Sequence, residues 1–273
     1  MSKLAQLPAR GVVAVAGEDR VGFLQGLVSN DVALAAPGAA VWAALLTPQG
    51  KWLADFMILS DGERLLLDCE RAQVPMLVQR LMRYRLRARV GVEDLSAALS
   101  VHVAWDGTPA LPAEAIVAAD PRLPQAGLRI LAPQPLPTTA DADAWDAHRL
   151  GLGLPDGSRD LETEKTVLLE AGFDELHGVS WTKGCYMGQE LTARTKYRGL
   201  VKRRLVPVAV EGPTPAPGTP VRRSDGSEAG VMRSAHGTAG LALLRLDALD
   251  QVLACAGATL HPRPAAWMVL PPS

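Results

Sequence analysis

Every apolar stretch in this chain is short, and turn-forming residues separate one stretch from the next. The runs at 11–16, 41–46 and 128–132 have the length of a β-strand. None approaches the roughly 18–20 apolar residues that a membrane-spanning helix needs. A few other segments show helical spacing of their apolar residues. These patterns predict short strands with a few amphipathic helices, which is typical of an α+β fold.

The predicted elements occur in an order that repeats. Strands are expected at 11–16, 41–46, 51–59, 64–69, 101–105, 115–119 and 128–132, with alternating apolar residues at 86–92. Helices are expected at 21–28, 74–82 and 141–152. Strands and helices therefore recur twice, which predicts two α+β subdomains that share a sheet-based core.

The pattern changes near residue 200. A stretch rich in Pro and Gly at 211–218 is flanked by Val- and Leu-rich runs of strand length, at 204–210, 230–233, 240–246 and 251–254. Gly and Asp turns separate these runs. The C-terminal part of the chain is therefore predicted to be a small all-β module.

Composition and charge limit the classes of function. The 273 residues include 28 basic and 29 acidic side chains, and 48% are hydrophobic, which excludes disorder as the main state. The net charge of −1 argues against a protein that coats nucleic acid or an anionic membrane through its overall charge. Direct nucleic-acid binding and a membrane partner are therefore not expected.

The cysteines and the N-terminal residues suggest a cellular compartment. Cys69, Cys185 and Cys255 are odd in number and far apart, which excludes a disulfide scaffold and a zinc pair. The five histidines show no metal-binding spacing, so no metal site is predicted. The first residues, MSKLAQLP, lack the apolar segment of a signal peptide. A cytoplasmic protein is therefore expected.

The strongest chemical signal is the segment Lys183–Arg194, KGCYMGQELTAR. Gly184 would let the backbone turn sharply and place Cys185 near the N-terminus of a helix running through Arg194. That helix end and Lys183 would favour a thiolate, which could act as a nucleophile or as a ligand for a soft metal or cluster. Alternatively, Cys185 is a small buried hydrophobe. The residues alone leave both interpretations open.

The octamer KGCYMGQE at Lys183–Glu190 resembles the signature of the YgfZ family of folate-binding proteins, relatives of the glycine cleavage T-protein (aminomethyltransferase). The resemblance extends over nearly the whole chain. Five further blocks match the family in the expected order: Gly17–Val32, with Ser29 in place of Thr, Thr47–Lys51, Trp145–Pro155, Thr195–Gly199 and Gly240–Leu246.

The resemblance implies a fold and a domain organisation. The implied fold is an α+β, T-protein-like ring of two interleaved ferredoxin-like subdomains, followed by a small C-terminal β-barrel. The folate-binding region would span 1–200, with subdomains of roughly 1–95 and 96–200, and the barrel would span 201–273.

The resemblance also implies a function. The family binds tetrahydrofolate or a derivative and supports the assembly or repair of iron–sulfur enzymes, including enzymes that modify tRNA. The implied partners are folate and iron–sulfur client enzymes or assembly proteins, with a transient iron–sulfur contact through Cys185. The resemblance favours an accessory protein over a classical enzyme, despite the aminomethyltransferase-like fold, and leaves enzymatic activity open.

Particular residues follow from the matching positions. The functional signature consists of Cys185 and Lys183, at its working centre, with Gly184, Tyr186, Gly188, Gln189 and Glu190. Residues expected at the folate are Trp145, whose indole suits a flat ring, and Asn30, Asp31, Arg149 and Asp55. Trp145 could instead be an ordinary core residue, and Asn30 and Asp31 could instead end a helix.

Two other functions are kept as alternatives. The first is a folate-dependent one-carbon transferase of the aminomethyltransferase class. The stretch Lys51–Phe56 disfavours it, because Asp55 is the single acid where those enzymes carry an Asp-Asp pair. The second is a folate sensor or adaptor without catalysis, which would leave the Lys-Gly-Cys segment unexplained.

Two runs of basic residues have no assigned role in any of these three functions. One consists of Arg80, Arg83, Arg85, Arg87 and Arg89, and the other of Lys196, Arg198, Lys202, Arg203 and Arg204. Solvated helix and strand faces would explain both runs. The alternative is binding of a folate glutamate tail or of an acidic patch on a partner.

Overall fold

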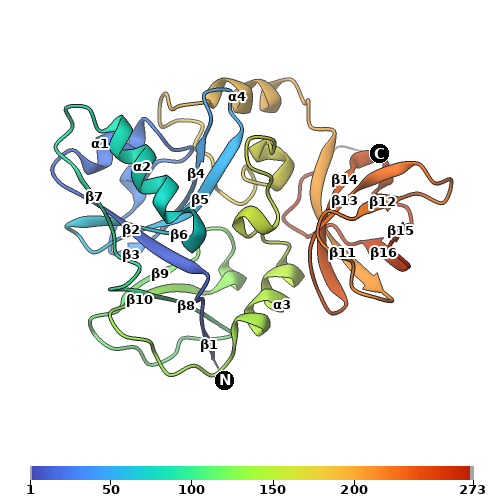
Figure 1. Cartoon of the computed structure of the whole chain (residues 1–273), viewed down its shortest axis with the longest axis horizontal. Coiled ribbons are helices and arrows are strands. Elements are labelled where there is room, and N and C mark those ends of the chain that lie inside the picture. The colour runs from blue at the N-terminus through green and yellow to red at the C-terminus, as the bar shows by residue number, and fades with distance from the viewer. Residues whose placement is uncertain (1, 271–273) are drawn as a thin grey trace. The chain divides into compact units, whose positions relative to one another are not determined.

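The computed structural model describes residues 2–270 (Figure 1). Contacts within the chain divide it into two compact units. The first contains the residues up to Ala142 together with His177–Gln189, and the second contains Asp143–Leu176 together with the chain from Glu190 onward. The segment that carries the KGCYMGQE signature therefore belongs almost entirely to the first unit, although it lies late in the sequence.

One antiparallel sheet of the first unit has the strand order β4-β5-β6-β2-β7. Its strands are β2 (Arg10–Ala16), β4 (Val41–Leu46), β5 (Trp52–Ser60), β6 (Arg64–Glu70) and β7 (Gly91–Asp94). Two helices pack on it, α1 (Arg20–Gln25) and α2 (Val74–Tyr84). Leu24, Leu77 and Leu81 enter the same buried cluster as residues of β2, β5 and β6, and Figure 1 shows α2 across this sheet. The helical spacing of those leucines accounts for their common face.

A second sheet of the first unit has the order β1-β8-β10-β9-β3. Its strands are β1 (Lys3–Gln6), β3 (Gly38–Ala39), β8 (Ser100–Trp105), β9 (Ile116–Ala119) and β10 (Leu128–Ala132). The pair β3–β9 is parallel and the others are antiparallel. The chain thus enters this sheet through β1 and β3 before it builds the remaining strands after residue 99. The strands of the two sheets are interleaved along the sequence.

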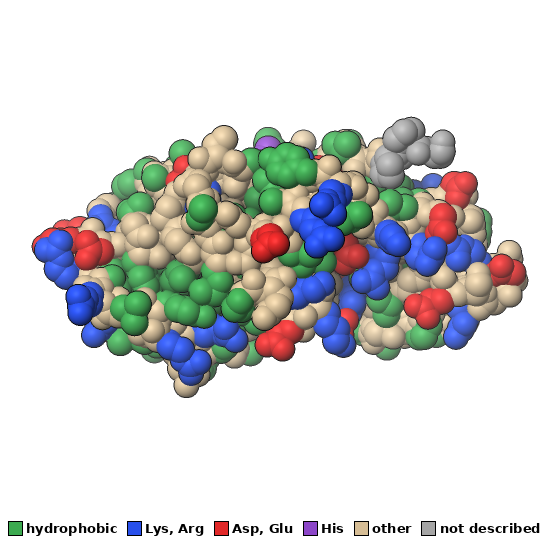
Figure 2. Space-filling view, turned by 90° about the horizontal axis from the view of Figure 1, so that it is seen from above, with side chains coloured by type: hydrophobic (Ala, Val, Ile, Leu, Met, Phe, Trp, Pro, Cys, Tyr) green, Lys and Arg blue, Asp and Glu red, His purple; other side chains and the backbone are tan. Residues whose placement is uncertain are grey.

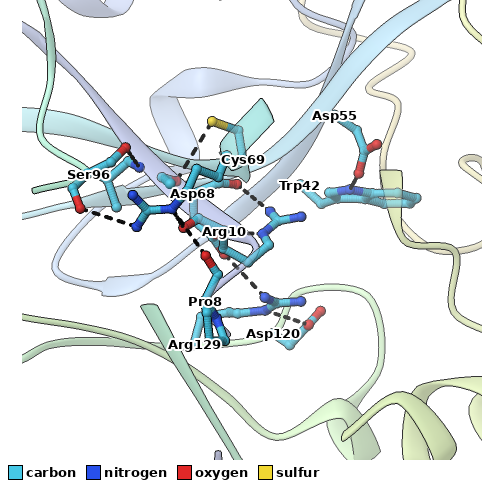
Figure 3. Close-up of polar contacts among 12 residues, drawn as sticks. Pro8, Arg10, Trp42, Asp55, Asp68, Cys69, Ser96, Asp120 and Arg129 are labelled. Carbon is cyan, nitrogen blue, oxygen red and sulfur yellow. Dashed lines mark hydrogen bonds and ion pairs between the residues drawn. The ribbon is translucent and has the colours of Figure 1, made fainter. Parts of the chain in front are cut away.

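Buried charges connect the two sheets (Figure 3). Arg10 on β2 donates from Nε to Oδ1 of Asp68 on β6 at 2.7 Å, and Arg129 on β10 donates to Oδ2 of Asp68 at 3.2 Å. Arg129 also reaches Asp120, which Arg122 binds at 2.8 Å. Burial would raise the pKa of Asp120, but the guanidinium groups of Arg122 and Arg129 outweigh it and lower this pKa to about 2. Asp120 is therefore ionised, and Asp68 and Asp120 each join two arginines.

We predict that Asp68→Asn lowers the free energy of unfolding by about 3–5 kcal/mol, because it removes the buried carboxylate that Arg10 and Arg129 share. Urea denaturation monitored by circular dichroism measures the loss. The matched control is Asp106→Asn, since the exposed Lys3–Asp106 pair should contribute less than about 1 kcal/mol. Equal small losses in both variants would contradict the structural role of Asp68.

The second unit contains a closed barrel of six antiparallel strands, in the order β11-β14-β13-β12-β15-β16. The strands are β11 (Arg203–Glu211), β12 (Pro220–Arg222), β13 (Glu228–His236), β14 (Ala239–Arg245), β15 (Leu253–Cys255) and β16 (Ala258–Pro262). Alternate residues such as Val206, Val208 and Val210 fill its interior. This unit also contains most of α3 (Ala142–Leu152) and α4 (Gln189–Tyr197). Leu150 of α3 packs against Leu205 and Leu241 of the barrel.

The structure confirms the predicted α+β class and the C-terminal barrel. The predicted strand at 86–92 is wrong over most of its length, because β7 begins at Gly91 and hydrogen-bonded turns occupy the preceding residues. The predicted helix at 21–28 ends at Gln25. The domain limits 1–200 and 201–273 stay a prediction. Within 2–270, none of the helices combines the length and the apolar character that crossing a membrane requires.

Candidate functional site

The signature loop is fastened to the end of α1. The ammonium group of Lys183 donates to the main-chain oxygens of Gln25 and Val28, at 2.6 Å each. Met187 donates its backbone N–H to the oxygen of Gly26 at 3.1 Å. A cation suits this position, because the last carbonyl groups of a helix have no partners within the helix and carry partial negative charge. The loop is therefore held on both sides of Cys185.

Two polar side chains after α1 hold the start of the same segment. Ser29 Oγ donates to the oxygen of Gly178 at 2.6 Å and accepts from the N–H of Ala44 on β4. The Asn30 side-chain amide donates to the oxygen of His177 at 2.6 Å and to that of Trp42 at 2.8 Å. Both side chains are buried. They connect β4 to residues that lie about 150 positions later in the sequence.

Within the signature, small and polar residues shape the loop. Gly184 has a φ of +95°, which confirms the predicted sharp turn. A Cβ on Gly188 would lie 2.4 Å from the oxygen of Thr47, so the loop approaches the hairpin that joins β4 and β5 too closely for a side chain. Gln189 Oε1 accepts the N–H of the buried Tyr186 at 3.1 Å. The Lys183 ammonium lies 5.1 Å from the centre of the Tyr186 ring.

Cys185 is exposed, whereas Cys69 and Cys255 are buried. Its thiol makes no hydrogen bond to any residue in 2–270. Burial raises the pKa of the Cys255 thiol. Burial is also the largest cause that raises the pKa of Cys69, to about 12. The interpretation of Cys185 as a small buried hydrophobe is therefore excluded.

The expected environment of the thiol needs two corrections. The helix begins at Gln189, four residues after Cys185, and therefore does not place the thiol at its N-terminus. The ammonium of Lys183 is directed to carbonyl oxygens and makes its hydrogen bonds with them. Lys183 thus positions the loop, and Glu190 lies in the first turn of α4, where an acid offsets the helix dipole.

Asp31 and Asp55, the other predicted site residues of the first unit, use their carboxylate oxygens for hydrogen bonds within the protein. Asp31 accepts from Gln25 Nε2 at 2.8 Å and caps the start of the short helix Val32–Leu34. It does not end α1, which stops at Gln25. Asp55 is buried and accepts from two indole N–H groups, those of Trp42 at 2.9 Å and Trp52 at 3.1 Å. Figure 3 shows Asp55 above the edge of the Trp42 ring.

Trp145 and Arg149 lie on α3, in the second unit. Trp145 is buried, and its ring centre lies 5.7 Å from that of His148. The Arg149 guanidinium binds Asp160, donates to Asp146 at 2.6 Å and donates to Ser234 on β13 at 2.8 Å. Arg149 thereby fastens α3 to the barrel. A role of either residue in folate binding stays a prediction.

The second unit also has a cavity of about 380 Å³, lined by Leu169, Asp174, Glu175, Lys196, Gly199, Val201, Arg204, Leu246 and Val269. None of the residues expected at folate lines it. Residues 2–270 contain no group of three or more His, Cys, Asp or Glu side chains placed to hold a metal ion.

Sequence reasoning missed several residues that build the site. Gln25 and Ser29 appeared only as letters of a matching block, and His177 was not singled out. Their contributions are main-chain oxygens and one hydroxyl, which carry little chemical signature in a sequence. Position 29 offered a usable signal, because Ser29 replaces the Thr of the family pattern but keeps the hydroxyl group that binds the oxygen of Gly178.

We predict that the free energy of unfolding rises with pH between about 8 and 10.5 because of Lys183. Burial lowers the pKa of Lys183 from 10.5 to about 8, and the Asp31 carboxylate opposes this shift. In that range the unfolded chain therefore binds more protons than the folded chain, and stability increases with pH. Solvent screening of this partly exposed group limits the gain to about 1 kcal/mol.

Urea unfolding of the wild type and of Lys183→Met at several pH values isolates this contribution, since the other titrating groups are common to both. The rise should be smaller in the variant by the stated amount. Identical pH dependence in the two proteins would contradict the buried position of the ammonium group.

Comparisons with known proteins support one family. A family model described as the CAF17 C-terminal β-barrel domain matches residues 202–270. The mitochondrial iron–sulfur cluster assembly factor IBA57 homolog of Mycosarcoma maydis is 40% identical over 230 residues, covering 76% of this chain and 57% of that protein. The human mitochondrial IBA57 protein is 35% identical over 275 residues. The match covers 88% of this chain and 76% of the human protein. The chain thus spans little more than half of the first relative's length.

A solved structure shows the fold. The glycine cleavage system aminomethyltransferase T from Bartonella henselae superposes on this chain with a TM-score of 0.72 at 15% sequence identity. The superposition covers 98% of this chain and 86% of the aminomethyltransferase. The predicted T-protein-like fold is confirmed.

The expected cytoplasmic location is wrong. The relatives from Mycosarcoma maydis, human and mouse are all named as mitochondrial proteins, which points to mitochondria and away from the cytoplasm. The signal-peptide pattern on which that expectation rested concerns secretion and does not distinguish the cytoplasm from mitochondria.

Proposed function

Because this chain belongs to the IBA57 family of iron–sulfur cluster assembly factors, we propose that it supports the assembly or repair of iron–sulfur enzymes through Cys185. The observation that carries this proposal is the exposed thiol on a loop fastened at both ends. An exposed cysteine on a fixed loop is available to a partner, whereas the two buried cysteines are not.

The chemistry of a single thiol limits this role. An iron–sulfur cluster normally takes four thiolate ligands, and Cys185 is the only exposed cysteine within 2–270. Stable storage of a cluster by one copy is therefore disfavoured. Cys185 would instead bind the cluster transiently while a client enzyme or assembly protein supplies the remaining ligands. Lys183 contributes by holding the loop, so that the thiol does not have to be ordered on binding.

Tetrahydrofolate or a derivative is proposed as the cofactor. Most hydrogen-bonding atoms of Asn30 and Asp55 are engaged within the first unit. These two residues would therefore hold the surrounding backbone in place and would not bind folate directly. Asp31 is half-buried and uses Oδ1 for both of its hydrogen bonds. Its Oδ2 is the better acceptor for a pterin N–H.

The geometry favours an accessory protein over a one-carbon transferase. Proton transfer requires a carboxyl group that reaches the substrate, and the single acid of β5, Asp55, is buried between two indole N–H groups. Membership of the narrower YgfZ family, and indirect support of tRNA modification through client enzymes, belong to this proposal as well.

We predict that wild-type protein restores the activity of a [4Fe–4S] dehydratase in cells that lack this protein, and that Cys185→Ser restores less than about a tenth of it, because a hydroxyl is a poor ligand for iron–sulfur clusters. Protein levels are matched by immunoblot. Thr182→Ala, in the same exposed loop, should rescue fully. Equal rescue by Cys185→Ser would favour the folate adaptor, and failure of the wild type would refute the cluster role.

Folate binding is tested separately by anaerobic calorimetry with tetrahydrofolate. The wild type should bind, and Asp31→Asn should bind about tenfold more weakly, because it loses a charge-assisted hydrogen bond. Asp106→Asn is the control for loss of an exposed aspartate. Absence of binding by the wild type would remove folate from the proposal while leaving the role of Cys185 to the rescue experiment.

A further inference from the structure

The segment 71–92 concentrates positive charge, since it contains six arginines and no acidic residue. Arg71 donates to the main-chain oxygens of Pro8 and Arg10, and Arg89 pairs with Glu18 and Asp19. The remaining four make no side-chain hydrogen bond or ion pair with any residue in 2–270: Arg80, Arg83, Arg85 and Arg87. Guanidinium groups without partners are available to an anionic ligand.

Apolar side chains project from the middle of these charges. Leu86 is 88% exposed and Met82 is 40% exposed. Leu86 directly follows Arg85, the C-cap of α2, and has a φ of +45°. Helices usually place Gly at this left-handed position, because a side chain is strained there. The chain instead keeps a large apolar residue at the position, which leaves it projecting into solvent.

The turn that presents Leu86 is well defined. The N–H of Ala88 bonds to the oxygen of Arg85 at 2.7 Å, and the N–H of Arg89 bonds to the Asp19 carboxylate at 2.8 Å. On the other side, Leu77 and Leu81 bury α2 in the core of the sheet. The exposed residues therefore project from a fixed support.

This combination suits a flat anionic surface with an apolar interior. The phosphates of a nucleic acid would bind the arginines, but a nucleic acid offers no apolar environment to Leu86 and Met82. A protein partner would need a pocket for a protruding leucine, which is an under-represented residue among the dominant contacts of protein interfaces. An anionic bilayer binds both features, because its headgroups attract clustered arginines and its acyl region accepts short apolar side chains.

We propose that the end of α2, comprising Arg80, Met82, Arg83, Arg85, Leu86 and Arg87 and called here the basic tip, binds the surface of anionic membranes. Leu86 enters the boundary between headgroups and acyl chains, and the arginines contact lipid phosphates. The binding is peripheral and reversible, since four arginines and one inserted leucine provide a modest affinity.

The expectation that this protein has no membrane partner rested on the net charge of the whole chain. Figure 2 shows acidic and basic side chains mixed over much of the face it displays, in keeping with the net charge of −1. The basic tip differs, because its charges are all of one sign within one helix end and turn. Electrostatic attraction to a membrane acts over roughly one Debye length, so the local charge decides binding.

The test is flotation of the full chain with vesicles of phosphatidylcholine, either alone or with about 30% phosphatidylglycerol. Wild-type protein should float with the anionic vesicles only, and about 0.5 M salt should release it. The triple variant Arg83→Gln, Arg85→Gln, Arg87→Gln should bind about 100-fold more weakly, which is about fivefold for each arginine. Leu86→Ser should bind about tenfold more weakly.

Two controls match these changes elsewhere on the surface. Arg222→Gln, Arg245→Gln, Arg263→Gln removes the same net charge from exposed positions in the barrel unit, and Val252→Ser removes another exposed apolar side chain. Both should bind as the wild type does. All of the substituted residues are exposed, and unchanged melting temperatures would show that the variants fold.

Three results would overturn the proposal. One is a wild type that does not float with anionic vesicles, and another is equal binding by the tip variants and their controls. The third is binding to an RNA duplex that depends on the three arginines but not on Leu86, which would assign the tip to nucleic acid. None of these results depends on Cys185 or on folate, so the proposed function is tested independently.

Discussion

The site depends on the hydrogen bonds that Ser29 and Asn30 make with residues late in the chain. Through one hydroxyl and one amide, they connect the end of α1, strand β4 and the backbone at His177 and Gly178. Both side chains are buried, so each lost bond would leave unsatisfied polar groups in the interior. The cost of breaking these bonds keeps the signature loop in the first unit.

A chain of buried polar contacts supports this junction. Asn30 binds the oxygen of Trp42, the Trp42 indole binds Asp55, and the Arg122 guanidinium lies 5.4 Å from the centre of the Trp42 ring. Arg122 in turn binds Asp120, which belongs to the network that joins the two sheets. Desolvation of buried charges of this kind offsets most of their mutual attraction, so the network adds little net stability even though removal of one partner is costly.

The sequence predicted what depends on local pattern. Strands such as 41–46 and 128–132 were located because apolar residues and turns determine them. Short strands after residue 200 predicted an all-β module, and the family resemblance implied that it is a barrel. The exposure of Cys185, the hydrogen bonds of Lys183 and the two indoles on Asp55 were beyond its reach. Each depends on residues that are brought together by the fold. The strand predicted at 86–92 failed because alternation of Arg with Leu, Ala and Val resembles a half-buried strand, whereas here it reflects a turn with exposed Leu86.

Lys183 illustrates how position changes the meaning of a residue in a motif. Beside Cys185 in the sequence, a cation suggests activation of the thiol. In the structure its hydrogen-bonding capacity is directed to two carbonyl oxygens at the end of α1, and burial lowers its pKa to about 8. A lysine that served mainly to stabilise a thiolate would gain from staying fully charged at the surface. Placing it under the loop instead costs solvation of the ammonium group but fixes the backbone on which the thiol is carried. The Lys-Gly-Cys sequence therefore separates three tasks: Lys183 orders the loop, Gly184 supplies the turn, and Cys185 remains exposed.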